Sequence, residues 1–320
     1  MSDISPVYAA SRIRALEGTL LTPAQLDSLV TSKNAEAAVR LLISYGWNEP
    51  EEYGIRSLIA SEEMRAWDIV NELLPDCAEK KFLTCLNDHY NIKTAVKAFV
   101  SGASAETAYP SRIDVPTAVA ALKSADHGLI PEDLREALRE GYSALVSSSD
   151  GQASDTAVDR MAMLSLIKFA DESGSDFLRA YADATVSSAD LMIAYRGSRA
   201  GKRKVLFEDA LVSTSDLDAD ALAEAASHGT DAFFAFVEGT SLASLAELLK
   251  SDASAFEKKC DDILVSIINQ TRTVPFGTDP VAAFWLAKQS ELKDVRILLV
   301  CKQNGVSPEK ISERMRELYV

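Results

Sequence analysis

One helical frame recurs three times along this 320-residue chain, and it constrains the fold more than any other feature of the sequence. Each copy has an aromatic residue, a polar residue nine positions later and a glycine eleven positions after that. The copies are Phe82, Asn91 and Gly102; Tyr181, Asp190 and Gly201; and Trp285, Asp294 and Gly305. Because a glycine readily adopts the left-handed conformation that ends a helix, each copy predicts a long helix, a turn and a returning segment.

The spacing of the copies predicts three structural units. The polar positions lie 99 and 104 residues apart, whereas tetratricopeptide, ankyrin and HEAT repeats have periods of roughly 33 to 47 residues. We therefore expect three similar helical units, at residues 1–108, 109–213 and 214–320. A second pattern, a polar tripeptide followed by apolar residues at fixed spacing, occurs in the first and third units. It consists of Ser32-Lys33-Asn34 before Ala38 and Leu42, and of Ser227-His228-Gly229 before Phe233 and Val237.

Local signals favour an all-α fold. Alanine and leucine, which favour helix, are abundant, and no Asn-Gly or Asp-Gly pair lies between alternating β-branched residues. Thr22-Pro23-Ala24-Gln25 predicts a helix start with a capping box. We expect further starts at Asp279-Pro280 and Ser307-Pro308. The helix expected between these two starts has an apolar stripe that is predicted to be buried: Val281, Trp285, Leu292, Val295 and Leu299. Lys288, Glu291 and Lys302 lie nearer the edges of this stripe than opposite it.

The charge of the chain excludes some classes of partner. The formal net charge is −15 at pH 7, and a field of this sign repels nucleic-acid phosphate and anionic lipid headgroups. The densest apolar run, Ile297–Cys301, has five residues, whereas a membrane-spanning helix needs roughly 20. The N-terminal segment has no apolar region typical of a secretory signal. We expect an intracellular protein without direct lipid insertion or nucleic-acid binding.

Motifs that would carry chemistry are incomplete. Gly197–Arg203 resembles a phosphate-binding loop, but it has three residues between its glycines instead of four and an arginine after the lysine. Asp261-Asp262 resembles the start of an aspartate-rich metal motif, and we interpret it as the first turn of a helix. His89 is interpreted as a surface or capping residue in a polar turn, and Cys301 as a small buried hydrophobe. We expect no catalytic residues, cofactor or metal.

One basic cluster stands out in this acidic chain. It has five cationic residues within nine positions: Arg196, Arg199, Lys202, Arg203 and Lys204. Two interpretations are open. The cluster is either a solvated helix end, where cations are favourable, or a docking surface for an acidic partner.

Both ends of the chain resemble one family. The segment Tyr8–Glu17, followed by Leu20-Leu21, resembles the start of the C subunit of archaeal and bacterial V-type (A-type) ATPases, the counterpart of the d subunit of eukaryotic V-ATPases. The stretch from Asp279-Pro280 to Tyr319 is similar to the C-terminus of this family, and Asn91-Ile92-Lys93 to its internal signature.

The resemblance implies three helical domains around a pseudo-threefold axis, shaped like a funnel or socket. It also implies a non-catalytic central-stalk part between the D and F subunits of the central shaft and the membrane proteolipid (c/K) ring, so that the chain would be cytoplasmic and peripheral to the membrane. Neither the ion, proton or sodium, nor the direction of ATP turnover follows from it. The alternatives are a helical scaffold or adaptor unrelated to rotary motors and a helical enzyme with an unrecognised site.

Overall fold

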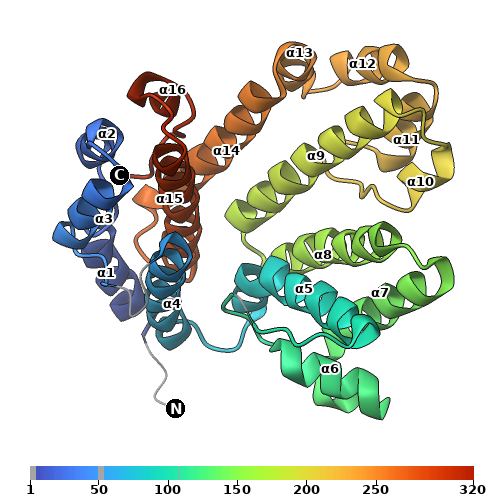
Figure 1. Cartoon of the computed structure of the whole chain (residues 1–320), viewed down its shortest axis with the longest axis horizontal. Coiled ribbons are helices and arrows are strands. Elements are labelled where there is room, and N and C mark those ends of the chain that lie inside the picture. The colour runs from blue at the N-terminus through green and yellow to red at the C-terminus, as the bar shows by residue number, and fades with distance from the viewer. Residues whose placement is uncertain (1–4, 50–53, 108) are drawn as a thin grey trace. The chain divides into compact units, whose positions relative to one another are not determined.

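The computed structural model describes residues 5–49, 54–107 and 109–320, and this part of the chain is helical without any strand (Figure 1). The predicted all-α class is confirmed. The chain divides into two compact units, residues 1–83 with 254–320 and residues 84–253. The first unit contains α1 (Pro6–Glu17), α2 (Pro23–Thr31), α3 (Ala35–Ser44), α4 (Ile55–Leu73), most of α14 (Ala253–Asn269), η3 (Gln270–Thr273), α15 (Asp279–Gln303) and α16 (Pro308–Ser312).

The second unit begins within α5 (Ala78–Ser101), which the two units share. Its other elements are α6 (Val115–Ser124), η1 (His127–Leu129), η2 (Glu132–Leu134), α7 (Arg135–Ser148), α8 (Gly151–Ser173), α9 (Asp176–Arg199), α10 (Lys204–Glu208), α11 (Ala219–Ser227), α12 (Thr230–Glu238) and α13 (Ala243–Ser251).

The order of helices along the chain repeats three times. Short helices are followed each time by two long ones, which are α4 and α5, α8 and α9, and α14 and α15. The last long helix of each set has 24, 24 and 25 residues. The division into three domains remains a prediction, and its first boundary, residue 108, lies outside the described residues.

Helix starts agree with the sequence signals in part. Thr22 and Gln25 form the predicted capping box of α2. The helix start expected at Asp279-Pro280 is found, but Asp279 is the first residue of α15 rather than the residue before it, and Thr278 at that position makes no side-chain capping bond. Ser307 precedes α16 without a side-chain cap, and α16 has only five residues. The returning segment of the third copy is therefore mostly irregular.

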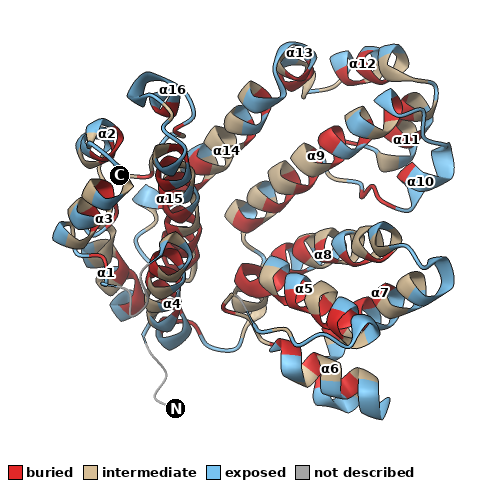
Figure 2. Cartoon of the chain, in the orientation of Figure 1, coloured by how far each residue is buried: buried red, intermediate tan, exposed pale blue. Residues whose placement is uncertain are grey.

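The core of the first unit forms around the second half of α15. Residues of α15 from Leu292 onward pack with α2, α3, α4 and α16, and Trp285 contacts Trp67 with ring centroids 5.1 Å apart. The five predicted stripe residues are buried, and much of α15 has the colour of buried residues in Figure 2. Lys288 and Glu291, predicted near the edges of the stripe, are buried as well, so the buried surface of α15 extends beyond the five apolar residues.

The second unit repeats this packing with other helices. The second half of α5 packs with α6, η2, α7 and α8, and Ile92 and Val96 are among its fully buried residues. α9 packs on α11 and α12, where Tyr195 lies 5.7 Å from Phe234, centroid to centroid. In α5 and in α9, the half of the helix that follows the polar position of the frame packs against other helices of the unit.

Candidate interaction site

The three polar positions of the frame are fully buried within long helices. Asn91, Asp190 and Asp294 are each at most 1% exposed. The three glycines of the frame follow the ends of α5, α9 and α15 with φ of +71°, +62° and +68°, values that favour glycine. The aromatic positions differ, because Phe82 and Trp285 are buried whereas Tyr181 is half-buried.

Each buried polar residue bonds to the backbone 22 residues further along the chain. Asn91 Nδ2 donates to the carbonyl of Ile113 at 3.0 Å. Asp190 Oδ2 accepts from the amide of Val212 at 3.0 Å, and Asp294 Oδ1 from the amide of Arg316 at 3.4 Å. The returning segment is thus fixed to the middle of its long helix in all three copies.

These buried carboxyl groups are costly to ionise. Burial raises the pKa of Asp190 to about 7 and that of Asp294 to about 7, and the nearby Arg160 and Arg316 oppose the shift only in part. One carboxyl oxygen of each aspartate is buried without a hydrogen-bond partner. Both groups are enclosed by packing, and neither lines the pocket described below.

A buried ionic network joins α4 and α15 in the first unit. Lys288 Nζ lies 2.6 Å from Glu291 Oε1 and 3.1 Å from Glu62 Oε1, and all three side chains are at most 3% exposed. Arg65 pairs with Glu62, and the amide of Leu21 donates to Glu291 Oε2. Every charge in the network faces an opposite charge, which offsets the cost of burial.

His89 and the pair Asp261-Asp262 have structural roles that differ from those predicted from the sequence. His89 lies inside α5 and is 1% exposed, with Nδ1 2.7 Å from the carbonyl oxygen of Cys85, so the surface assignment was wrong. Asp261-Asp262 lies in the middle of α14 rather than in its first turn. Asp261 pairs with Arg316 at 2.9 Å. Cys301 is buried, as predicted.

The segment that resembles a phosphate loop is the C-terminal end of α9. Gly201 adopts the left-handed conformation, and the amide of Lys202 donates to the carbonyl of Gly197 at 3.0 Å. This pair of features is the Schellman motif that ends helices. Phosphate loops instead offer backbone amides at the N-terminus of a helix, so the end of α9 has the wrong polarity for that role.

The basic cluster extends from the last turn of α9 to the start of α10. Lys204 lies 2.8 Å from Glu224 and 3.5 Å from Glu208, and this contact raises the pKa of Lys204. The guanidinium of Arg199 lies 5.5 Å from the ring centroid of Tyr195. Arg196 is exposed. Lys202 and Arg203 are exposed and have no ion pair among the described residues.

Next to these two cations lie two exposed aliphatic side chains that the sequence pattern did not single out. Val205 and Leu206, in the first turn of α10, are 46% and 45% exposed. The following residue, Phe207, is buried. A comparison of the segments after Gly201 and Gly305 would have revealed this difference, since Glu309 and Lys310 occupy the corresponding positions of the third copy.

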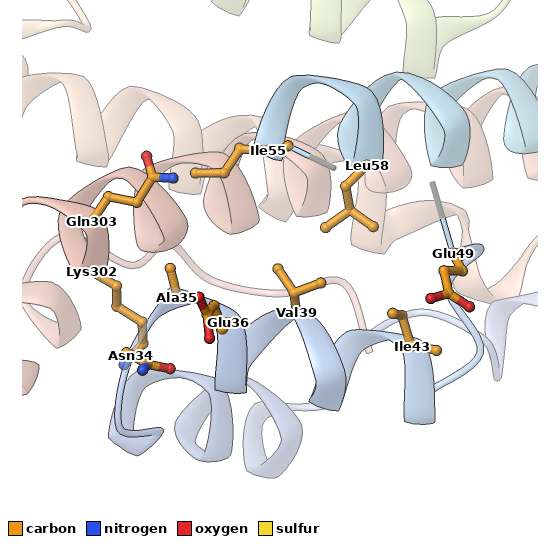
Figure 3. Close-up of a pocket in the computed structure, with 11 residues that line it drawn as sticks. Asn34, Ala35, Glu36, Val39, Ile43, Glu49, Ile55, Leu58, Lys302 and Gln303 are labelled. Carbon is orange, nitrogen blue, oxygen red and sulfur yellow. The ribbon is translucent and has the colours of Figure 1, made fainter. Parts of the chain in front are cut away.

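A pocket of about 490 Å³ lies in the first unit between α3, α4 and the end of α15 (Figure 3). Val39 and Ile43 of α3 face Ile55 and Leu58 of α4 across it, so its walls are largely aliphatic. Lys302, the lysine in its lining, donates to the carbonyl oxygens of Val30 and Ser32 at 2.8 and 2.6 Å. Lys302 thereby stabilises the C-terminal end of α2.

Membrane-spanning helices and metal clusters are not found in the described part of the chain. Across residues 5–49, 54–107 and 109–320, no helix is both long and apolar enough to cross a membrane. The same residues contain no group of three or more His, Cys, Asp or Glu side chains arranged to hold a metal ion.

The described residues form an all-helical protein with exposed cations and exposed aliphatic side chains at the start of α10. A family model described as "ATP synthase (C/AC39) subunit" matches residues 9–314, and the chain belongs to this family of V-type and A-type ATPase subunits. The family assignment disfavours the alternative of an adaptor unrelated to rotary motors.

Curated relatives agree with the family. The chain is similar to the C subunit of the V-type sodium ATPase of Enterococcus hirae, with 24% identity over 272 residues that cover 82% of this chain and 81% of the relative. It is also similar to the C subunit of the A-type ATP synthase of Methanocaldococcus jannaschii, with 25% identity over 352 aligned positions, 97% of this chain and 86% of the relative. The corresponding subunit of Thermococcus kodakarensis is 22% identical, with 97% of this chain and 90% of the relative covered.

Proposed function

We propose that this chain couples the soluble shaft of a rotary ATPase to its membrane ring. Its partners would be the D and F subunits of the shaft on one side and the proteolipid ring on the other. The chain would then be a cytoplasmic rotor subunit, held at the membrane through the complex. The observation that carries the proposal is the family match, which spans residues 9–314 and therefore nearly all of the chain.

The packing of the helices is consistent with the proposal that the chain transmits torque. A coupling part must resist twisting, and closely packed helices with paired buried charges are stiff. The hydrogen bonds from Asn91, Asp190 and Asp294 to the backbone 22 residues later fix each returning segment to its long helix. The network around Lys288 joins α4 to α15. We further propose three domains at residues 1–108, 109–213 and 214–320, which the repeated order of helices supports.

The basic cluster is proposed as an assembly contact of this rotor subunit. Charge complementarity between subunits affects encounter rate and partner choice and weakens with salt. An exposed ion pair contributes only about 0–1 kcal/mol to folding. Replacing Arg199, Lys202 and Arg203 by serine should leave the melting temperature nearly unchanged and weaken association with the rest of the rotor.

The test is removal of the chain from the source organism. Membranes from cells without the chain should keep the proteolipid ring and lose the nucleotide-hydrolysing head, which should be found in the soluble fraction with its ATPase activity intact. Adding back the purified chain should return the head to the membrane. A head that stays attached and ion-pumping without the chain would contradict the proposal.

A further inference from the structure

The turn between α9 and α10 holds a surface that the fold of the chain does not need. Phe207 is 2% exposed and packs against Gly197 so closely that a Cβ atom there would lie 2.3 Å from Phe207 Cε1. Together with the Schellman bond from Lys202 to Gly197, this contact fixes α10 to the end of α9. The outer side of α10, with Val205 and Leu206, is therefore presented on a rigid support.

The third copy of the frame shows which of these residues the fold requires. In the register that aligns Gly201 with Gly305, Phe207 corresponds to Ile311, and both are buried. The exposed pair that corresponds to Val205 and Leu206 is Glu309 and Lys310. Since the same local structure forms there with two charged residues, folding does not demand two exposed aliphatic side chains.

Charge distinguishes the two copies as well. Exposed Lys202 and Arg203 precede the aliphatic pair in the second copy, whereas Val306 and Ser307 take these positions in the third. Two cations beside two exposed aliphatic residues match a protein surface that pairs carboxylates with apolar side chains.

We propose that Lys202, Arg203, Val205 and Leu206 form a docking surface for an acidic segment of another rotor subunit. In the bound state the aliphatic pair is covered by apolar side chains of that segment, and its carboxylates face the two cations. This inference rests on the proposed function, because the partner is taken to belong to the same complex.

A protein partner suits this surface better than an anionic membrane. Exposed Glu208 and Asp209 follow directly on the other side of the aliphatic pair, and a flat layer of anionic headgroups would face them as well as the cations. The net charge of −15 would repel such a layer further. A partner segment can instead place its acidic groups opposite Lys202 and Arg203 alone.

The experiment measures binding of the labelled chain to the two parts obtained from cells without it, the soluble head with its shaft and the membranes that keep the proteolipid ring. One variant, Val205→Glu with Leu206→Lys, introduces the residue types that the third copy of the frame has at these positions. It is expected to have the melting temperature of the wild type. It should weaken binding about tenfold or more at both low and high salt, because apolar contacts are little screened. A second variant, Lys202→Ser with Arg203→Ser, should weaken binding about tenfold at about 50 mM salt and far less at about 500 mM. The matched control is Glu309→Ala with Lys310→Ala, which should bind like the wild type.

Each outcome separates this inference from the proposed function. If the wild-type chain binds neither the soluble head nor the ring-containing membranes, the proposed function fails. If the wild type binds and both variants bind equally well, the docking surface is refuted while the function stands. Vesicles of anionic phospholipid provide the remaining arm: binding of the wild type to them, lost in the same variants, would identify a membrane contact and overturn the proposal.

Discussion

Replacing Asp190 by asparagine should remove a pH-dependent weakness of the fold. Asp190 is 1% exposed and burial is the main cause of its raised pKa, about 7 against a usual value of 3.8. The folded state therefore binds this proton more tightly than the unfolded state. The stability that it contributes is complete below about pH 4 and is lost as the pH rises through about 7.

The size of the effect follows from the shift. A shift of one pKa unit corresponds to about 1.4 kcal/mol, so the ionised carboxyl lowers the free energy of unfolding by about 4 kcal/mol when fully deprotonated. Between about pH 5 and about pH 8 the loss is about 2–3 kcal/mol. An asparagine side chain stays neutral throughout, and it can still accept the bond from the amide of Val212 through its amide oxygen.

Urea unfolding of both proteins at the two pH values provides the measurement. The stability of Asp190→Asn relative to the wild type should rise by about 2–3 kcal/mol from about pH 5 to about pH 8. Exposed Asp209→Asn is the control for charge removal and should show no such trend. Asn91→Asp should create the same pH dependence in the first copy. A stability difference for Asp190→Asn that does not change with pH would refute the reasoning.

Further outcomes follow from the buried charges and from the end of α9. Lys288→Met should lower the free energy of unfolding by about 3–5 kcal/mol, because it leaves the buried carboxylate of Glu291 without a cation. Lys293→Met, at an exposed lysine that pairs with Asp261, should cost about 0–1 kcal/mol, and urea unfolding compares the two variants. Gly197→Ala should cost about 1–3 kcal/mol through its clash with Phe207, which a lower melting temperature would reveal. The chain alone should neither bind ATP tightly nor hydrolyse it, and calorimetry that found micromolar affinity abolished by Lys202→Ala would contradict this expectation.

The positions of the frame could be predicted from the sequence because each has a local physical cause. A glycine at a helix end and a proline after a capping residue act within a few residues, so Gly102, Gly201, Gly305 and the capping box of Thr22 were visible without a fold. The family resemblance added what local signals lack, the assignment to a rotary ATPase, and the family match agrees with it.

Burial of charged groups could not be predicted, because it depends on partners far along the chain. Lys288 pairs with Glu291 on its own helix, but its second partner, Glu62 of α4, lies 226 residues away. The periodicity of apolar residues places this lysine beside the apolar stripe of its helix, but it contains no information about a partner on another helix. The half-buried Asp261 likewise has a distant partner, Arg316, 55 residues away. Only the cations of the docking surface could be predicted, because they form a run in the sequence, whereas its aliphatic residues follow no pattern that distinguishes them.

The central claim, mechanical coupling between ATP chemistry and ion movement, is tested most directly in reconstituted vesicles. The complex is reconstituted with and without the chain, and ATP hydrolysis and ion uptake are measured on the same samples. We predict that hydrolysis continues without the chain while ATP-driven uptake is lost, and that adding the purified chain restores uptake. Equal uptake per ATP hydrolysed in the presence and absence of the chain would contradict the claim.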